Sequence, residues 1–225
     1  EASLFVLVDG ETILPIGTAQ DHKRVGDGDT GLNTGGMGAY SPAPILNEEV
    51  LKKTIERIIR PTMREMVRRG MPFTGVLYAG LMIKNADPRL VEYNVRFGDP
   101  ECQVLMMRLG GQILDALLST AKGELSDVKI NWAEDHSITV VMASNGYPGS
   151  YKKGTQINGL ANLPLDSNFI CFHAGTIEKN GKILANGGRV LNITTRAETL
   201  INAQKNAYEM IETIDWPEGF YRKDI

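Results

Sequence analysis

The sequence has few cysteines and histidines. Its 225 residues contain two cysteines, Cys102 and Cys171, and three histidines. Neither type recurs at a metal-binding spacing, and no Ser-His-Asp or Cys-His arrangement of a nucleophilic enzyme can be read from the chain. Two distant cysteines are typical of reduced, packed thiols in a cytoplasmic protein, although a pairing between them stays open. We therefore expect a cytoplasmic location.

Long hydrophobic runs and an excess of one charge are also lacking. No apolar stretch approaches the ~20 residues that span a bilayer, and the first residues lack a signal-peptide layout. The formal net charge is −3, with 24 basic and 27 acidic residues interspersed. This balance gives no electrostatic reason to expect nucleic acid or a membrane as a partner. The length fits one large or two small domains.

The chain begins with Glu1 and enters a predicted strand almost at once. The segment "SLFVLVDGETILPI" predicts a strand, a turn at Asp9-Gly10 and a second strand. A natural chain starts with Met and rarely enters a sheet so early. We therefore expect that a preceding part has been removed, with trimming of only a few residues as the alternative.

Periodicity predicts further elements in the first part of the chain. A helix is expected from the N-cap Asn47 to Gly70, with Pro61 kinking or splitting it. Its apolar stripe is interpreted as core packing. The other predicted elements are a strand over 75–84, a turn over 85–88, a strand over 90–97 and a helix over 112–123.

A polar, charged segment over 124–136 marks the predicted domain boundary, which separates domain 1–130 from domain 131–225. The second domain is expected to be β-rich, with a hairpin turn at Asn180-Gly181. Its last helix is expected to follow a capping box formed by Thr195 and Glu198. The strands predicted there are "SITVVMAS", "FICFHAGTIE", "GKILA" and "RVLNIT".

The stretch "LVEYNVRFGDPEC" (90–102) combines a strand pattern with an unusual choice of polar residues. Side chains alternate between the faces of a strand, so Glu92, Asn94 and Arg96 share one face. Polar residues on a solvated sheet face need no function, and this interpretation stays open. However, Asn is depleted in strands. A carboxylate and an amide oxygen offer Mg²⁺ hard ligands, and Arg96 offers phosphate a planar cation. The pattern therefore predicts a magnesium–nucleotide site. The apolar residues expected on the other face are Val91, Tyr93, Val95 and Phe97.

A second candidate site lies in the glycine-rich segment 18–44, for which no regular structure is predicted. Its glycines let backbone amides approach a ligand, and successive amides can form an anion-binding concavity. Charges of both signs fit a zwitterionic or phosphorylated small molecule. The alternative is a surface loop with solvated charges, because glycine-rich loops alone are weak evidence. The residues concerned are Gly31, Gly35, Gly36 and Gly38, with Asp21, Lys23, Arg24, Asp27, Asp29 and Asn33.

Two other features are less specific. In "NGGRVLNI", two glycines precede Arg189, which could present its cation to an anion or lie in a tight surface turn. Among the histidines, His22 lies in the glycine-rich segment and could contact a ligand. His173 is expected to be a hydrogen-bonded structural residue.

Several long motifs, taken in order, resemble the glycinamide ribonucleotide synthetase family of the ATP-grasp superfamily. They are "TAQDHKRVGDGDTGLNTGGMGAYSPAP", "FTGVLYAGLMI", "VEYNVRFGDPE", "GGRVL" and the final "YRKDI". The resemblance runs from Glu1 to Ile225. It implies an α+β fold: the carboxy-terminal portion of an ATP-grasp domain, with an antiparallel sheet and helices, followed by a small β-rich carboxy-terminal domain.

The resemblance also implies an activity. The family joins glycine to 5-phosphoribosylamine with ATP, through glycyl phosphate, as an early step of purine biosynthesis. Magnesium or manganese bridges the ATP phosphates. The implied partners are therefore three small molecules (ATP, glycine and 5-phosphoribosylamine), together with the missing amino-terminal part of the chain.

The family's functional residues carry over to particular positions. The Glu-x-Asn metal ligands fall on Glu92 and Asn94, and Arg96 would stabilise the transferring phosphoryl group. Asp21 and Lys23 are assigned with Arg96 as catalytic residues. The residues assigned to substrate binding are Arg24, Asn33, Thr34, Gly35, Gly36, Asp99, Glu101, Gly188 and Arg189.

Two features depart from the family's pattern. The strand "LYAGLMI" offers no further acidic ligand, so a second metal held by protein is in doubt. The amino-terminal domain and the nucleotide-clamping subdomain are absent, so the chain is expected to be inactive alone. Two alternatives are another ATP-grasp carboxylate–amine ligase and a non-catalytic phosphate- or nucleotide-binding module.

Overall fold

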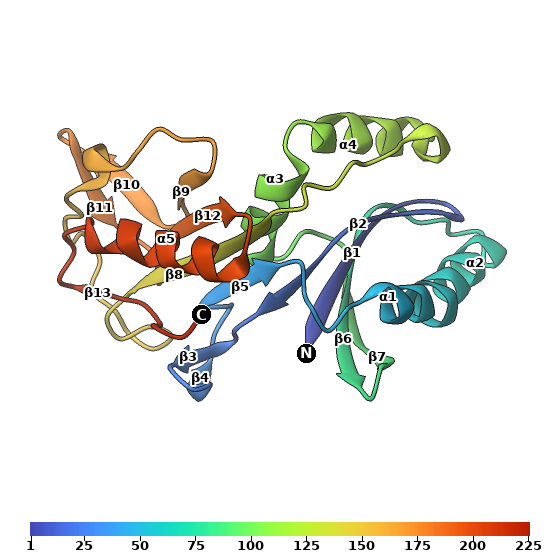
Figure 1. The fold of residues 1–225 in the computed structure, drawn as a ribbon, viewed down its shortest axis with the longest axis horizontal. Coiled ribbons are helices and arrows are strands. Elements are labelled where there is room, and N and C mark those ends of the chain that lie inside the picture. Colours follow the sequence, from blue (N-terminus) through green and yellow to red (C-terminus); the bar gives the residue numbers. More distant parts are fainter. The chain divides into compact units, whose positions relative to one another are not determined.

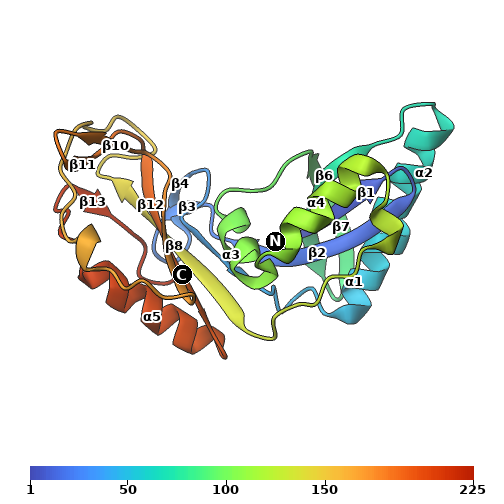
Figure 2. The ribbon, with the colours of Figure 1, turned by 90° about the horizontal axis from the view of Figure 1, so that it is seen from above.

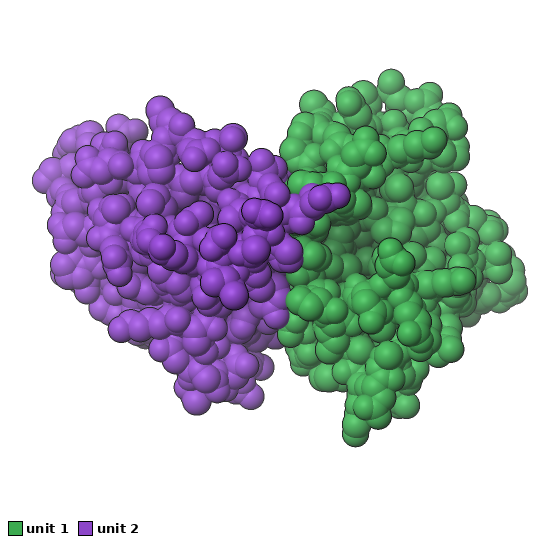
Figure 3. All heavy atoms as spheres, in the orientation of Figure 1, with its two compact units in different colours: residues 1–20, 41–98, 108–133 green, residues 21–40, 99–107, 134–225 purple.

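The structure, a computed structural model, describes all residues from Glu1 to Ile225. They form two compact units, coloured separately in Figure 3. Unit 1 comprises residues 1–20, 41–98 and 108–133, and unit 2 comprises residues 21–40, 99–107 and 134–225. The predicted division into domains 1–130 and 131–225 stays a prediction. The units differ from it in grouping 21–40 and 99–107 with the carboxy-terminal residues.

The sheet of unit 1 is antiparallel, with strand order β7-β6-β1-β2 (Figure 1). The predicted turn at Asp9-Gly10 is confirmed, because Asp9 pairs with Thr12 and Gly10 has a φ of 60°. Glycine adopts this left-handed conformation without steric cost. The strands are β1 (Ala2–Asp9), β2 (Thr12–Asp21), β6 (Thr74–Lys84) and β7 (Asp87–Asn94).

The long helix expected after Asn47 forms as three consecutive segments: α1 (Glu48–Thr54), a π-helical turn η1 (Ile55–Ile59) and α2 (Arg60–Arg68). Asn47 caps α1 by accepting a hydrogen bond from Val50 N over 3.0 Å, as predicted. Pro61 does not split the helix. Its ring cannot donate a backbone hydrogen bond and crowds the preceding turn, and the wider π turn just before it accommodates both effects.

Helices cover both faces of the unit 1 sheet. The α1–α2 helix packs its buried Ile59 and Met63 against Leu4 and Val6 of β1. The helix α4 (Gln112–Lys122), predicted over 112–123, contacts β1 and β6 (Figure 2). It ends at Gly123, whose φ of 78° is left-handed. A short 3₁₀ turn, η2 (Leu125–Asp127), follows. The helix α3 (Glu101–Leu109) was not predicted.

The hairpin of β6 and β7 differs from its prediction at the far end. Its two-residue turn is made by Asn85 and Ala86, both with positive φ. The register passes from Gly80 opposite Glu92 to Leu81 opposite Leu90, which leaves Val91 as an extra, bulged residue. This bulge breaks the strict alternation. The expected apolar face is therefore wrong in part: Val91 and Val95 are 61% and 70% exposed. The strand also ends at Asn94 rather than at residue 97.

Unit 2 contains a sheet in the order β5-β8-β12-β9, with β13 also paired to β8. The expectation that segment 18–44 lacks regular structure is wrong, because β2 extends to Asp21 and three short strands follow. These three are β3 (Arg24–Gly26), β4 (Thr30–Asn33) and β5 (Gly38–Ser41). The others are β8 (His136–Ser144), β9 (Phe169–His173), β10 (Thr176–Lys179), β11 (Lys182–Ala185), β12 (Arg189–Ala197) and β13 (Gly219–Phe220).

The last helix, α5 (Leu200–Glu212), packs against β8 and β12 through Ala203, Ala207 and Ile211. The predicted capping box is wrong. Thr199 caps α5 by accepting from Asn202 N over 3.2 Å. Thr195 lies within β12 and donates its hydroxyl to Ala203 O. β12 thus continues past the point where the sequence pattern places the start of the helix. A 3₁₀ turn, η3 (Leu160–Asn162), precedes β9.

The hairpin turn predicted at Asn180-Gly181 is confirmed, because these residues join β10 and β11 with φ values of 53° and 72°. None of the helices is long and apolar enough to cross a bilayer.

Candidate functional site

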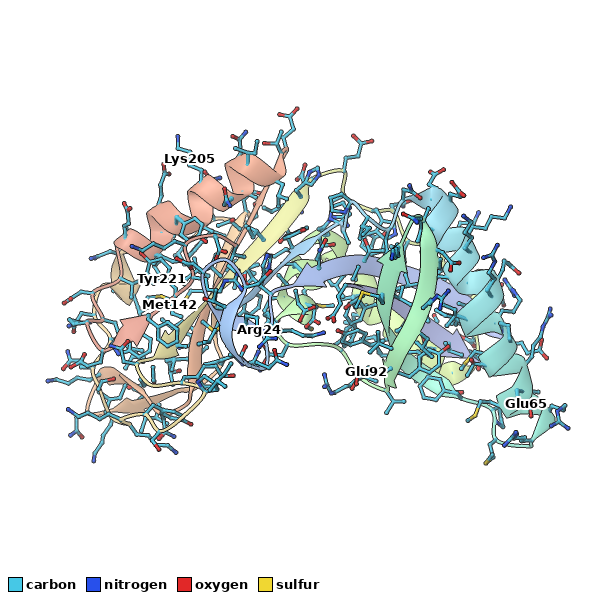
Figure 4. All side chains as sticks on the ribbon, turned by 90° about the horizontal axis from the view of Figure 1, so that it is seen from below. Arg24, Glu65, Glu92, Met142, Lys205 and Tyr221 are labelled. Carbon is cyan, nitrogen blue, oxygen red and sulfur yellow. The ribbon has the colours of Figure 1, made fainter.

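Three predicted residues gather at the end of β7 in unit 1. The Asn94 Nδ2 donates to Glu92 Oε1 over 3.0 Å, and the Arg96 Nη2 donates to Asn94 Oδ1 over 3.4 Å. Arg96 lies just past the strand and also donates to Phe97 O over 2.8 Å. Glu92 and Arg96 are exposed, and Asn94 is half-buried. The three side chains therefore form one connected polar group that is open to solvent (Glu92 is labelled in Figure 4).

The neighbouring strand β6 adds no ligand to this group. Gly80 lies opposite Glu92, and Tyr78 lies opposite Asn94. No cluster of three or more His, Cys, Asp or Glu residues occurs in the structure. The group offers one carboxylate and one amide oxygen. That set fits a hard divalent cation held by one or two protein groups, with phosphates and water completing its shell.

The glycine-rich segment forms a second group, in unit 2, tied to the start of the same segment. Thr34 N donates to Lys23 O over 2.7 Å, and the Thr34 hydroxyl donates to the same oxygen over 2.9 Å. Gly36 N in turn donates to Thr34 Oγ1 over 2.9 Å. These bonds close the chain between Lys23 and Gly36 into a compact loop around the β3–β4 hairpin.

Arg189 holds this loop from the start of β12. Its Nη1 donates to Gly35 O over 2.9 Å and to Asp99 O over 2.7 Å, and its Nη2 contacts Asp99 Oδ2 at 3.2 Å. The guanidinium predicted to face an anion is thus bonded to the protein's own backbone and to a carboxylate. Its role in binding a ligand stays a prediction.

The close packing explains two glycines. A Cβ at Gly35 would lie 2.8 Å from Arg189 Nη2, and a Cβ at Gly36 would collide with the Pro100 ring. Gly36 also has a φ of 118°, which L-residues rarely adopt. Gly188 is buried under the Tyr147 ring, where a Cβ would collide with its Cδ2.

The remaining predicted residues differ in exposure. The carboxylate of Asp21 is 4% exposed and lies 3.9 Å from the ammonium of Lys23, which is 46% exposed. Arg24, on β3, donates to Gly31 O over 2.8 Å (Figure 4). Asn33 is exposed, and Glu101 is buried at the start of α3. Their proposed roles in catalysis or substrate binding stay predictions.

Two contacts of the glycine-rich segment were missed. The Tyr147 hydroxyl accepts from Gly35 N over 3.1 Å. Arg222, only 2% exposed, donates to Asp29 Oδ1 over 2.8 Å and to Arg24 O over 3.1 Å. It also pairs with Asp224 over 2.7 Å, which holds the pKa of that carboxyl well below its usual range. The "YRKDI" motif names these residues, but nothing local in it indicates contact with a hairpin so far away in sequence.

His22 lies at the base of this segment. Its Nδ1 is buried without a hydrogen-bond partner, and its ring lies 5.9 Å from that of Tyr40. Burial lowers the pKa of His22, and the nearby Arg222 cation lowers it further. No ligand contact of His22 is tested by the structure. The predicted structural role of His173 agrees with its bond to Thr176 Oγ1 at 2.9 Å.

Family models match both parts of the chain. The ATP-grasp (A) domain of phosphoribosylglycinamide synthetase matches residues 1–102, and the C domain of the same family matches residues 137–225. The crystal structure of phosphoribosylamine–glycine ligase from Thermotoga maritima covers all of this chain with a TM-score of 0.89 at 35% identity. The α+β ATP-grasp fold predicted from the sequence is therefore confirmed.

Relatives with similar sequences carry the same name. A phosphoribosylamine–glycine ligase of Brucella melitensis is 56% identical over 100% of this chain, which covers 53% of that relative. One of Vigna unguiculata is 53% identical over 98% of this chain, which covers 72% of that relative. The chain belongs to the phosphoribosylglycinamide synthetase family. It spans about half the length of most curated relatives it matches and 55% of the Thermotoga maritima chain.

Proposed function

We propose that the chain supplies the metal-binding strand and the glycine-rich segment of an ATP-dependent ligase. The ligase joins glycine to 5-phosphoribosylamine and releases ADP and phosphate, in purine biosynthesis. Family membership supports this reaction class. The observation that carries it is the connected group of Glu92, Asn94 and Arg96 on one side of β7, linked by contacts of 3.0 and 3.4 Å.

The proposed reaction has two steps. An oxygen of the glycine carboxylate attacks the γ-phosphorus of ATP, and the bond from that phosphorus to the ADP oxygen breaks. The nitrogen of 5-phosphoribosylamine then attacks the acyl carbon of glycyl phosphate, phosphate leaves, and the nitrogen loses a proton. Both steps move negative charge onto phosphate oxygens, so catalysis depends mainly on positioning and on fixed positive charge.

Glu92 and Asn94 are the proposed ligands of Mg²⁺, or of Mn²⁺. Bound there, the cation would orient the ATP phosphates and neutralise part of their charge. Arg96 is proposed to contact the transferring phosphoryl group, because its planar fork matches two phosphate oxygens and keeps its charge at any physiological pH. Its present bonds to Asn94 Oδ1 and Phe97 O leave donors available for such a contact.

The glycine-rich segment is proposed to face the substrates. Arg189, Tyr147 and Thr34 hold its backbone in one conformation through the bonds described above. A rigid segment of this kind keeps the exposed side chains of Arg24 and Asn33 in place before a ligand arrives, which lowers the entropy cost of binding. Asp99 and Glu101 are proposed to orient the incoming amine.

The activity is proposed for a ligase of full family length, because this chain spans about half the length of its relatives. We expect no turnover from the 225 residues alone. The test compares this chain with a full-length ligase of the family that carries it as its corresponding segment. ADP formation is measured with ATP and Mg²⁺, with glycine and 5-phosphoribosylamine added singly and together.

The expected result is ADP formation in the full-length ligase that requires both substrates, and none from the chain alone. Turnover by the isolated chain would contradict the expectation that it is inactive. ADP formation that needs a different acid or amine would instead identify another carboxylate–amine ligase. Nucleotide binding without any ADP formation would identify a binding module.

A further inference from the structure

The outer side of β9 is an open strand edge. β9 is the last strand in the order of the unit 2 sheet and pairs only with β12 (Figure 1). In an antiparallel pair, alternate residues exchange hydrogen bonds with the neighbouring strand, and the residues between them point their backbone groups the other way. Two bonds that flank β9 show which residues belong to each set.

Arg196 N donates to Asn168 O, and Ala174 N donates to Val190 O. In the register of the two strands, this places Ile170 and Phe172 in the set that bonds to β12. The N–H and C=O of Cys171 and His173 therefore point to the open edge. No residue of the structure accepts from or donates to these four groups. The other outward amide, that of Phe169, already donates to Asp166 O.

This edge lacks the usual protection against pairing. Natural edge strands carry lysine, proline or a bulge that discourages a further strand. The sequence of β9, "FICFH", contains no lysine, no proline and no carboxylate, and its register with β12 is regular. Apolar side chains also surround it: Ile170 is 41% exposed and Leu165 is fully exposed.

A cavity of about 440 Å³ lies beside the same strand. One wall is formed by Phe169, Ile170 and Cys171 of β9, and the other by Leu160, Leu163 and Leu165. An added strand would therefore find both unpaired backbone groups and apolar surface, the combination that recognition by strand addition requires.

We propose that β9 pairs antiparallel with β9 of a second copy of this chain, across a two-fold axis at Phe172. In this register Cys171 lies opposite His173 of the second copy, and His173 opposite its Cys171. The four open groups of each copy then all find partners. Phe172 lies against Phe172 of the second copy as a non-hydrogen-bonded pair, in which side chains approach closely.

A second copy fits this edge better than an unrelated strand for a geometric reason. An antiparallel pair of identical strands is closed by its own two-fold symmetry, so one patch satisfies itself and no further edge remains. The spacing of the open groups, at two alternate residues, is the smallest that a symmetric pair can use without disturbing the bond from Phe169 to Asp166.

The test measures the mass of the 225-residue chain in solution by light scattering and sedimentation over a range of concentrations. The expected mass at high concentration is twice 24.7 kDa. Ile170→Lys places a charge beside the axis and is expected to raise the dissociation constant by about tenfold or more. Ile177→Lys is the matched control, because Ile177 is also 41% exposed but lies on β10. It is expected to leave the constant unchanged.

Amide hydrogen exchange tests the register independently. The amides of Cys171 and His173 are expected to exchange more slowly as the concentration rises, and to lose this protection in Ile170→Lys. A chain that stays monomeric at every concentration would overturn the proposal. So would a dimer that Ile170→Lys does not weaken, or one in which these two amides stay unprotected, because each outcome would place the contact elsewhere.

Discussion

The guanidinium of Arg189 contacts both the backbone and the side chain of Asp99: Nη1 donates to the Asp99 oxygen over 2.7 Å, and Nη2 meets its carboxylate at 3.2 Å. The same Nη1 donates to Gly35 O over 2.9 Å. Arg189 therefore joins the glycine-rich segment to the residue that begins the "DPE" turn after the metal-binding strand. The proposed substrate-facing group depends on this one side chain.

Replacing Arg189 by lysine should loosen the glycine-rich segment. An ammonium cannot bond to the Gly35 oxygen, the Asp99 oxygen and the Asp99 carboxylate with the geometry of a planar fork. We expect Arg189→Lys to lower the free energy of unfolding by about 1–3 kcal/mol and to speed hydrogen exchange in residues 34–36. Urea titration and exchange would measure these effects. Arg89→Lys, at a residue whose side chain is 82% exposed, is the control and should change neither. Equal exchange rates in all three proteins would contradict the bracing role.

Glu92→Gln should remove the charged metal ligand and leave the fold intact. Glu92 is exposed, and glutamine keeps its shape and can still bond to Asn94. In a full-length ligase we expect ADP formation to fall by about 100-fold or more. In this chain, Mn²⁺ binding followed by electron paramagnetic resonance should weaken, while the thermal midpoint stays the same. Glu178→Gln, on β10, is the matched control. Unchanged Mn²⁺ binding and activity in Glu92→Gln would refute the ligand role.

Gly36→Ala should destabilise the chain more than alanine at another glycine of positive φ. The new Cβ would collide with Pro100, and the φ of 118° is strained for any L-residue. We expect a loss of about 2–4 kcal/mol in the free energy of unfolding. Gly181→Ala is the control, because Gly181 has a φ of 72° and open space around its Cα. It should cost only about 1 kcal/mol. Similar losses at both positions would show that the Pro100 contact contributes little.

Stability should fall as the pH drops below the ordinary pKa of histidine, in part because of His22. Burial lowers the pKa of His22 below its ordinary 6.5, so the unfolded chain binds this proton more readily than the folded one. The stabilisation is complete above pH 6.5 and is lost as the pH falls through the window below it. His22→Phe removes this proton uptake and should flatten the dependence of the thermal midpoint between about pH 8 and 5. His136→Phe should keep the wild-type slope, and a His22→Phe slope equal to wild type would contradict the assignment.

Local signals predicted most of the secondary structure. The Asp9-Gly10 turn, the Asn47 cap, the Gly123 stop and the Asn180-Gly181 hairpin all appear where the sequence places them. Each depends on one or two residues whose backbone preferences act within a single turn. The failures have equally local causes. The β-bulge at Val91 and the extension of β12 through Thr195 are set by the neighbouring strands, which a single segment does not reveal.

The candidate site divides in the same way. Glu92, Asn94 and Arg96 were predicted to share one side because they lie on one short segment, and the alternation of a strand is enough to align them. The clamp of Arg222 on Asp29 was missed. These residues are 193 positions apart, and only the folded chain brings them to 2.8 Å.

The sequence by itself determined the family, the metal-binding strand and the order of the elements, because these properties reside in contiguous motifs and in backbone preferences over a few residues. Only the tertiary structure decided that Arg189 is spent on the protein's own backbone, that Arg222 is buried beneath the β3–β4 hairpin, and that β9 is left with an open edge. The physical reason is that a side chain's partners, and a strand's free hydrogen-bonding groups, depend on which distant segments pack beside it.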